Sequence, residues 1–235
     1  MALSAADEAP HPPSGRPAWH ESWVVEAFQA DGSLGLRMEF VLWPDQNRSE
    51  FSMLLVRPDA PVVWLNESEA PLPNHGLEVR ASGLWMAFVP QIPLDHFTAD
   101  LEAFALELDH PDDALGDGYG LRVPVAGEME WLHTPHDLTH GSPVADGNGY
   151  RVPGRVLGDF QVGHEDLEIT GWGWRTHTWG ETAVTDPWRG RSRIGDWSLG
   201  DDLGLVIGWG WGLNGQQHRL VETEAGIGWR SELAR

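Results

Sequence analysis

The sequence predicts an all-β protein. Short apolar runs rich in Val, Leu, Phe and Trp follow one another along the chain, and Gly, Pro, Asp and Asn separate them at intervals of roughly eight to twelve residues. No long amphipathic pattern with the period of a helix interrupts these runs. Turn signals at this spacing are typical of sandwiches and barrels, so we expect one of these architectures.

The first half of the chain predicts a series of strands. Residues 100–109 fit a strand through Phe104, Leu106 and Leu108, and they fit a helical stripe through Leu101, Phe104 and Leu108 equally well. We favour a strand because the neighbouring segments are β. The strands expected in this half are 22–30, 34–42, 51–57, 62–66, 77–81, 83–88 and 100–109.

Three regions divide the chain. Residues 1–17 are rich in Ala, Pro, Ser and Gly, so we expect a disordered tail. The Pro-, Asp- and Gly-rich stretch 110–120 predicts a junction between an N-terminal barrel-like half, 18–115, and a C-terminal one, 121–235. The strands expected in the second half are 128–132, 149–152, 154–163, 167–174, 179–184, 192–199, 204–212, 218–222 and 226–230.

Composition excludes several kinds of chemistry. The formal charge is −21, which argues against nucleic acid and anionic membranes as partners. All 15 basic residues are arginine, so lysine chemistry is excluded, and the absence of cysteine excludes thiol chemistry and disulfides. No signal-peptide pattern opens the chain, and no apolar run reaches the roughly 18 residues of a membrane span. We therefore expect a cytoplasmic protein without membrane insertion, and the oligomeric state is left open.

The segment 171–180, Gly-Trp-Gly-Trp-Arg-Thr-His-Thr-Trp-Gly, contains the most informative pattern. Because side chains alternate along a strand, Arg175, His177 and Trp179 share one face, and Trp172 and Trp174 share the other. An aromatic surface beside ionisable groups suits a pocket for a flat, apolar molecule. The alternative is a strand whose tryptophans fill a core while the arginine caps the end of a barrel.

A histidine cluster follows the strand expected at 128–132. His133, His136 and His140 lie close to Asp137, a combination that suits a metal site on a helix. Pro135 argues for a loop, and no zinc signature of known spacing is present. We therefore expect a solvated or capping cluster, with a pocket-lining role for one histidine as the alternative, and predict neither a metal ligand nor a cofactor.

Acid-assisted chemistry needs a carboxylic acid whose pKa is raised by an apolar environment. Asp196 fits best because it lies between apolar strand residues and precedes Trp197. The alternative for Asp196 is a salt bridge to Arg191 or Arg193. Glu21, flanked by tryptophans on its own strand face, is a further candidate, although an edge-strand charge is the expected role.

These observations define the candidate site residues. We expect His177, Arg175 and Asp196 to carry any catalysis, with His177 or Asp196 as the proton donor. The chain has 14 tryptophans against two tyrosines and seven phenylalanines, and tryptophan suits both cores and ligand-binding walls. The candidates for the pocket wall are Trp179, Trp85, Trp131, Trp197 and Trp209.

The blocks 150–163 and 171–180 resemble the carotenoid 1,2-hydratase-like (hydroxyneurosporene synthase-like) family and its uncharacterised actinobacterial relatives. The family strand reads approximately Gly-x-Gly-x-Arg-Asp-His-Ser-Trp-Gly. The matching residues are Gly171, Gly173, Arg175, His177, Trp179 and Gly180. Thr176 stands where the family has Asp, and Thr178 where it has Ser, so the usual acid is missing.

The resemblance implies two tandem lipocalin-like β-barrels, trimmed to fit this chain length, with a pocket near their junction. It implies binding of a hydrophobic isoprenoid, polyketide or steroid-like molecule, with acid-assisted hydration or cyclisation as the reaction of an enzyme. One alternative is a non-catalytic lipid- or pigment-binding protein, which the missing Asp favours. The other is a carbohydrate-binding β-sandwich.

Overall fold

The computed structural model describes residues 3–16, 18–116, 119–134, 144–146, 148–181, 204–224 and 226–233. Within these residues the chain forms β-strands and short 3-10 turns and no α-helix, so the all-β prediction is confirmed. No helix of the described residues has the length and apolarity to cross a membrane.

Apart from the short β9, which was not expected, the strands match the apolar runs in chain order. The strands of the first half are β1 (His20–Gln29), β2 (Gly35–Trp43), β3 (Arg48–Val56), β4 (Val62–Pro71), β5 (Leu77–Ala81), β6 (Leu84–Ile92) and β7 (His96–Leu108). Those of the second half are β8 (Leu121–His133), β9 (Val144–Asp146), β10 (Gly149–Val162), β11 (Glu165–Gly180), β12 (Leu205–Trp211), β13 (Gln216–Thr223) and β14 (Gly226–Leu233). The 3-10 turns are η1 (Ala5–Glu8), η2 (Pro44–Gln46), η3 (Pro111–Leu115) and η4 (Leu213–Gly215).

Some boundaries differ from those expected. The segment 100–109 is a strand, as favoured, within the longer β7. The strands expected at 149–152 and 154–163 are one strand, β10, and β11 continues from the segment 167–174 through residue 180. The strand expected at 192–199 lies outside the described residues.

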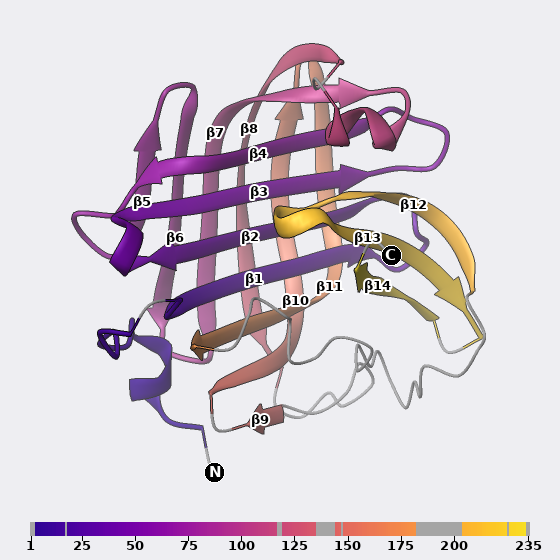
Figure 1. Cartoon of the computed structure of the whole chain (residues 1–235). Helices are drawn as coiled ribbons and strands as arrows, with labels where there is room; N and C mark the ends of the chain where they lie inside the picture. The colour runs from indigo at the N-terminus through magenta and orange to yellow at the C-terminus, as the bar shows by residue number, and fades with distance from the viewer. Residues whose placement is uncertain are drawn as a thin grey trace.

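A single antiparallel sheet contains strands from both halves of the chain. Its order is β4-β3-β2-β1-β11-β10-β8-β7-β6-β5, and an additional β4–β7 pairing closes it into a ring. In Figure 1, β1–β4 lie across β7, β8, β10 and β11, as in a flattened barrel. The expected halves 18–115 and 121–235 therefore share one ring instead of forming tandem barrels. The reason is that β1 pairs with β11 from His20–Gly180 to Gln29–Gly171, which joins the two halves by a continuous ladder.

A second, three-stranded sheet of order β12-β13-β14 covers the outer face of β1–β3. Its glycines permit this packing, because a Cβ on Gly208 would lie 2.9 Å from Val56, and one on Gly210 would lie 2.3 Å from Leu54. The outer apolar cluster also contains Trp174. Strands β1–β3 are consequently buried on both faces over nearly their whole length.

The interior of the ring is filled with aromatic and aliphatic side chains. Phe88 makes edge-on ring contacts with Phe40, Phe51 and Phe97 at centroid distances of 6.2, 6.3 and 5.5 Å. Such geometries are favourable for aromatic pairs. The described part of the ring is therefore a packed core, and its polar residues gather at one end.

The N-terminal segment differs from the expected disordered tail. Residues 5–8 form η1, and the Glu8 side chain is buried against the inside of the barrel. Its carboxylate accepts hydrogen bonds from the Leu94 main-chain N–H at 2.9 Å and from Arg175. The composition of this segment does not predict its ordered structure. The segment is ordered because the buried Arg175 needs a counter-charge, which Glu8 supplies.

Candidate functional site

Side-chain alternation along β11 agrees with the sequence prediction. Arg175 and His177 are fully buried inside the barrel, and Trp179 is partly buried against the same interior. Trp172 and Trp174 lie on the opposite face, against the outer apolar cluster. The strand thus places two ionisable groups in the interior and two tryptophans outside it.

Arg175 lies in an aromatic cage. Its guanidinium carbon is 4.8 Å from the ring centroids of Phe97 and Trp131 and 5.5 Å from that of Tyr150. Nη1 and Nη2 donate to the two carboxylate oxygens of Glu8, the second at 2.9 Å, and Nη1 also donates to the Tyr150 hydroxyl at 3.0 Å. The cage therefore holds a carboxylate that comes from outside the barrel.

Tyr150 and Glu8 stabilise the positive charge of Arg175. Burial alone would lower the pKa of Arg175, but the adjacent Tyr150 and the Glu8 carboxylate outweigh burial and raise it. Burial, together with Glu8, also raises the pKa of Tyr150, so Tyr150 keeps its proton. Arg175 and Tyr150 are thus a cation and a neutral hydroxyl directed at the same acceptor.

His177 is held by both of its ring nitrogens. Nε2 lies 2.8 Å from Oε1 of Glu21, and Nδ1 lies 3.0 Å from the main-chain oxygen of Asp7. The imidazole stacks on Trp23 at a centroid distance of 4.5 Å and lies 5.0 Å from the ring of Trp179. These contacts fix the orientation of the ring.

Glu21 is a buried carboxyl group between two histidines. The main-chain N–H of His11 donates to both of its oxygens at 3.0 Å, and His11 Nδ1 lies 2.8 Å from Oε1. Burial raises the pKa of Glu21 to about 8, against the opposing effect of the His11 N–H. Burial also lowers the pKa of His177 well below its ordinary value, and the charges of His11 and Arg175 lower it further.

The structure brings together only some of the predicted site residues. Trp131 forms one wall of the cage around Arg175, and Trp179 stacks on His11 at 3.7 Å. Trp209 lies on β12, in the sheet that covers the outside of the barrel. Trp85 lies on the outer face of β6, where its Nε1–H donates to Glu78 at 2.9 Å. The predicted residues Asp196 and Trp197 lie outside the described residues, as do His136 and His140.

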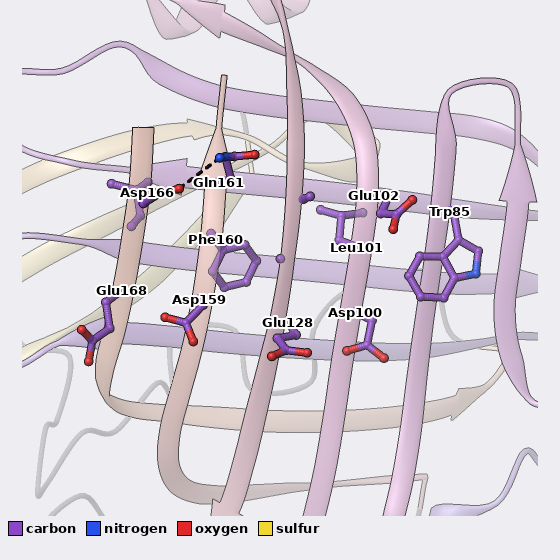
Figure 2. A pocket seen from close by; sticks show the side chains of 13 residues that line it. Trp85, Asp100, Leu101, Glu102, Glu128, Asp159, Phe160, Gln161, Asp166 and Glu168 are labelled. Carbon is purple, nitrogen blue, oxygen red and sulfur yellow. Dashed lines mark hydrogen bonds between the residues drawn. The ribbon is translucent and has the colours of Figure 1, made fainter. Parts of the chain in front are cut away.

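Trp85 belongs to a separate open groove of about 870 Å³ on the outside of the sheet. Figure 2 shows its side chains lying across β6, β7, β8, β10 and β11. Register pairing places Asp100 opposite Glu128, Glu128 opposite Asp159, and Asp159 opposite Glu168, so four carboxylates form one row across four strands. Burial and the charge of Glu128 raise the pKa of Asp100.

Sequence reasoning missed two residues of the interior site. Glu8 lies in the segment predicted to be a disordered tail, and Tyr150 is the first residue of the block 150–163, for which the sequence predicts no site residue. The signal for Tyr150 is its place two residues before Val152 on an alternating strand, which gives it the same face as the buried Val152 and Val156. The sequence predicts Glu21 as a carboxyl flanked by tryptophans, and its contact with His177 comes from the pairing of β1 with β11.

The fold and the site define an all-β barrel with a buried Arg–Glu pair and a His–Glu–His cluster at one end. The chain belongs to the family described as "Domain of unknown function (DUF7064)", whose model matches residues 4–230. No curated protein matches the chain.

Two solved structures show a distant likeness. The crystal structure of CghA with Sch210972 is similar with a TM-score of 0.40 and 11% identity, covering 77% of this chain and 54% of that chain. The crystal structure of CghA is similar with a TM-score of 0.39 and 12% identity, covering 78% and 54%. This chain thus spans about half the length of these structures.

Proposed function

We propose that this end of the barrel binds an apolar small molecule with an oxygen-bearing head group, of the isoprenoid, polyketide or steroid-like class. The observation that carries the proposal is the cage around Arg175. The guanidinium, which also donates to the Tyr150 hydroxyl, lies between three aromatic rings, and both Arg175 and Tyr150 interact with the Glu8 carboxylate of a separate segment. A carboxylate, enolate or carbonyl of the ligand would take the place of the Glu8 carboxylate.

Unused hydrogen-bond donors in the cage support this proposal. Among the described residues, Arg175 Nε and Trp131 Nε1 are buried and have no acceptor. Buried donors without a partner are uncommon in native proteins and call for an explanation. A ligand with further oxygen atoms would satisfy them, while the surrounding rings would contact its apolar body.

A ligand bound in this way could either react or remain unchanged. A guanidinium held in a dry cage would polarise a carbonyl of the bound molecule, which would accelerate a cyclisation that needs mainly shape and hydrogen bonds. The resemblance of the Arg175–Gly180 segment to the carotenoid 1,2-hydratase-like family favours a hydratase or cyclase. Without turnover, the same cage would serve a lipid- or pigment-binding protein, and assays with polyenes and polyketides separate the two.

The test compares two probes with the same polyene body, retinoic acid and retinol, by quenching of tryptophan fluorescence. We expect Glu8→Ala to bind retinoic acid at least tenfold more tightly than the wild type, because the internal carboxylate no longer competes. Arg175→Met should show no preference for retinoic acid over retinol, because the guanidinium that pairs with the carboxylate is gone. Circular dichroism establishes that both variants are folded.

The control is Glu181→Ala, which removes the exposed Arg16–Glu181 pair that holds the same N-terminal segment. An equal gain in affinity for retinoic acid in Glu181→Ala and Glu8→Ala would mean that loosening of the N-terminal segment, and not the cage, governs binding. If wild type and Glu8→Ala bind neither retinoid, the proposal is overturned. Binding of a sugar instead would favour the carbohydrate-binding alternative.

A further inference from the structure

The geometry points to a binding site for one divalent transition-metal ion, of the zinc class, formed by His11, Glu21 and His177. The residues come from three parts of the chain: the N-terminal segment, β1 and β11. One potential ligand atom from each residue lies within 4.8 Å of the other two. The sequence predicted no metal ligand, so this site departs from that expectation.

The distances between donor atoms fit such an ion. His11 Nδ1 and His177 Nε2 each lie 2.8 Å from Oε1 of Glu21. In a tetrahedral site with zinc–ligand bonds of about 2.0–2.1 Å, neighbouring donors are about 3.3 Å apart. All three donor atoms lie within 4.8 Å of one another, so small side-chain shifts would place an ion among them.

The tautomer of His177 is the one that a metal ligand needs. Nδ1 faces the main-chain oxygen of Asp7 at 3.0 Å, and a carbonyl oxygen only accepts hydrogen bonds, so Nδ1 carries the proton. The lone pair of Nε2 is then directed at Glu21. Metal-binding histidines commonly donate their other N–H to a carbonyl or carboxylate in this way, which fixes the ring.

The charge balance of the cluster favours a cation. Within the described residues, the ion-pair partners of Glu21 are the two histidines, and the nearby Arg175 is paired with Glu8. Asp7 adds a further negative charge beside His11, whereas Arg175 is the positive charge beside His177. A Glu21 carboxylate, together with Asp7, would offset the charge of a bound divalent ion.

The rings are also held in place before any ion binds. His11 stacks on Trp179 at a centroid distance of 3.7 Å, and His177 stacks on Trp23 at 4.5 Å. The main-chain N–H of His11 donates to both oxygens of Glu21 and orients the carboxylate. Two imidazoles and one carboxylate suit Zn²⁺, Fe²⁺ or Co²⁺, whereas Ca²⁺ and Mg²⁺ prefer oxygen ligands alone.

The experiment uses the full chain after treatment with a chelator. Zn²⁺ is titrated by calorimetry, and Co²⁺ by its visible absorption. We expect one Zn²⁺ per chain and a Co²⁺ spectrum typical of a low-coordinate nitrogen and oxygen site, with no saturable binding of Mg²⁺. His11→Ala and Glu21→Gln should each weaken Zn²⁺ binding at least a hundredfold.

His11→Ala is the key variant because His11 lies on a surface segment, so the barrel should fold without its side chain. His96→Ala is the matched control, since His96 is likewise a partly exposed histidine with a glutamate, Glu130, 3.9 Å away. It should bind Zn²⁺ as the wild type does. The inference is overturned if the wild type shows no saturable binding or if His11→Ala binds Zn²⁺ with wild-type affinity. The retinoid assay does not depend on this site's metal, so the two proposals fail independently.

Discussion

Arg175 on β11 and Glu8 in the N-terminal segment form a fully buried, two-point ion pair across 167 residues of sequence. Breaking a buried pair by removing one partner leaves an uncompensated charge, which typically costs about 3–5 kcal/mol. We therefore expect Glu8→Ala to lower the free energy of unfolding by about 3 kcal/mol, measured by urea denaturation without ligand.

Glu181→Ala is the comparison for that variant, because it removes an exposed pair to Arg16 of the same segment. Exposed pairs contribute about 0–1 kcal/mol. Similar losses in the free energy of unfolding of the two variants would show that Glu8 acts only by anchoring the segment and not by neutralising Arg175. An added carboxylate ligand should restore more stability to Glu8→Ala than to Glu181→Ala.

Close approach of two backbones explains the glycines that alternate with tryptophan at the start of the motif. A Cβ on Gly173 would lie 1.9 Å from the main-chain oxygen of Glu26, and one on Gly171 would lie 2.0 Å from that of Phe28. We expect Gly173→Ala to lower the free energy of unfolding by about 3 kcal/mol, since overpacking forces the strands apart.

Gly116→Ala is the control for this effect, because a Cβ there would meet only one atom, at 3.9 Å, and its φ is −104°. Its stability should stay within about 0.5 kcal/mol of the wild type, as is usual for a surface substitution. If Gly173→Ala is as stable as Gly116→Ala, then β1 and β11 do not approach as closely as the structure shows.

The parts of this molecule that follow from local pattern were predictable from the sequence. Alternation placed Arg175 and His177 on one face of β11 and Trp172 and Trp174 on the other, because side-chain direction depends only on the period of a strand. Alternation does not say which face is inside. Trp85, predicted as a pocket-wall residue, lies in the open groove on the outer face of the sheet, apart from Arg175 and His177.

The pairing of distant segments could not be derived in the same way. One ring in place of two barrels depends on the β1–β11 ladder, and nothing in either strand alone specifies its partner. The same holds for Glu8 and His11, whose Ala- and Pro-rich surroundings predict disorder. Their order depends on Arg175 and Glu21, which are buried inside the barrel and need partners.

The acidic row on the outer sheet face has a cost in stability. Like charges directly opposite each other on neighbouring strands repel, and each such pair lowers the free energy of unfolding by roughly 0.2–1 kcal/mol. Glu128 lies between Asp100 and Asp159, so Glu128→Gln should raise the free energy of unfolding by about 0.5 kcal/mol at low salt. The gain should shrink in 1 M NaCl, where screening is nearly complete over these distances.

Glu224→Gln provides the comparison, because this exposed glutamate lies in the turn between β13 and β14. It removes the same charge without touching the row. An equal gain in the free energy of unfolding for both variants would show that the effect comes from the net charge of −21 and not from the row.

The last prediction separates ligand binding from folding at Trp179. This side chain is partly exposed, stacks on His11 and packs against the barrel interior. Because full burial of a Trp is worth about 3–5 kcal/mol in Trp→Ala substitutions, we expect Trp179→Ala to cost about 2 kcal/mol in urea denaturation. Its affinity for retinoic acid should fall at least tenfold, since the ring lies on the same face of β11 as Arg175 and contacts His177 between them. Trp172→Ala is the matched variant, because Trp172 is also partly buried on β11 but faces the outer cluster. It should lose similar stability and keep the affinity, whereas an equal loss of affinity in both variants would make Trp179 a purely structural residue.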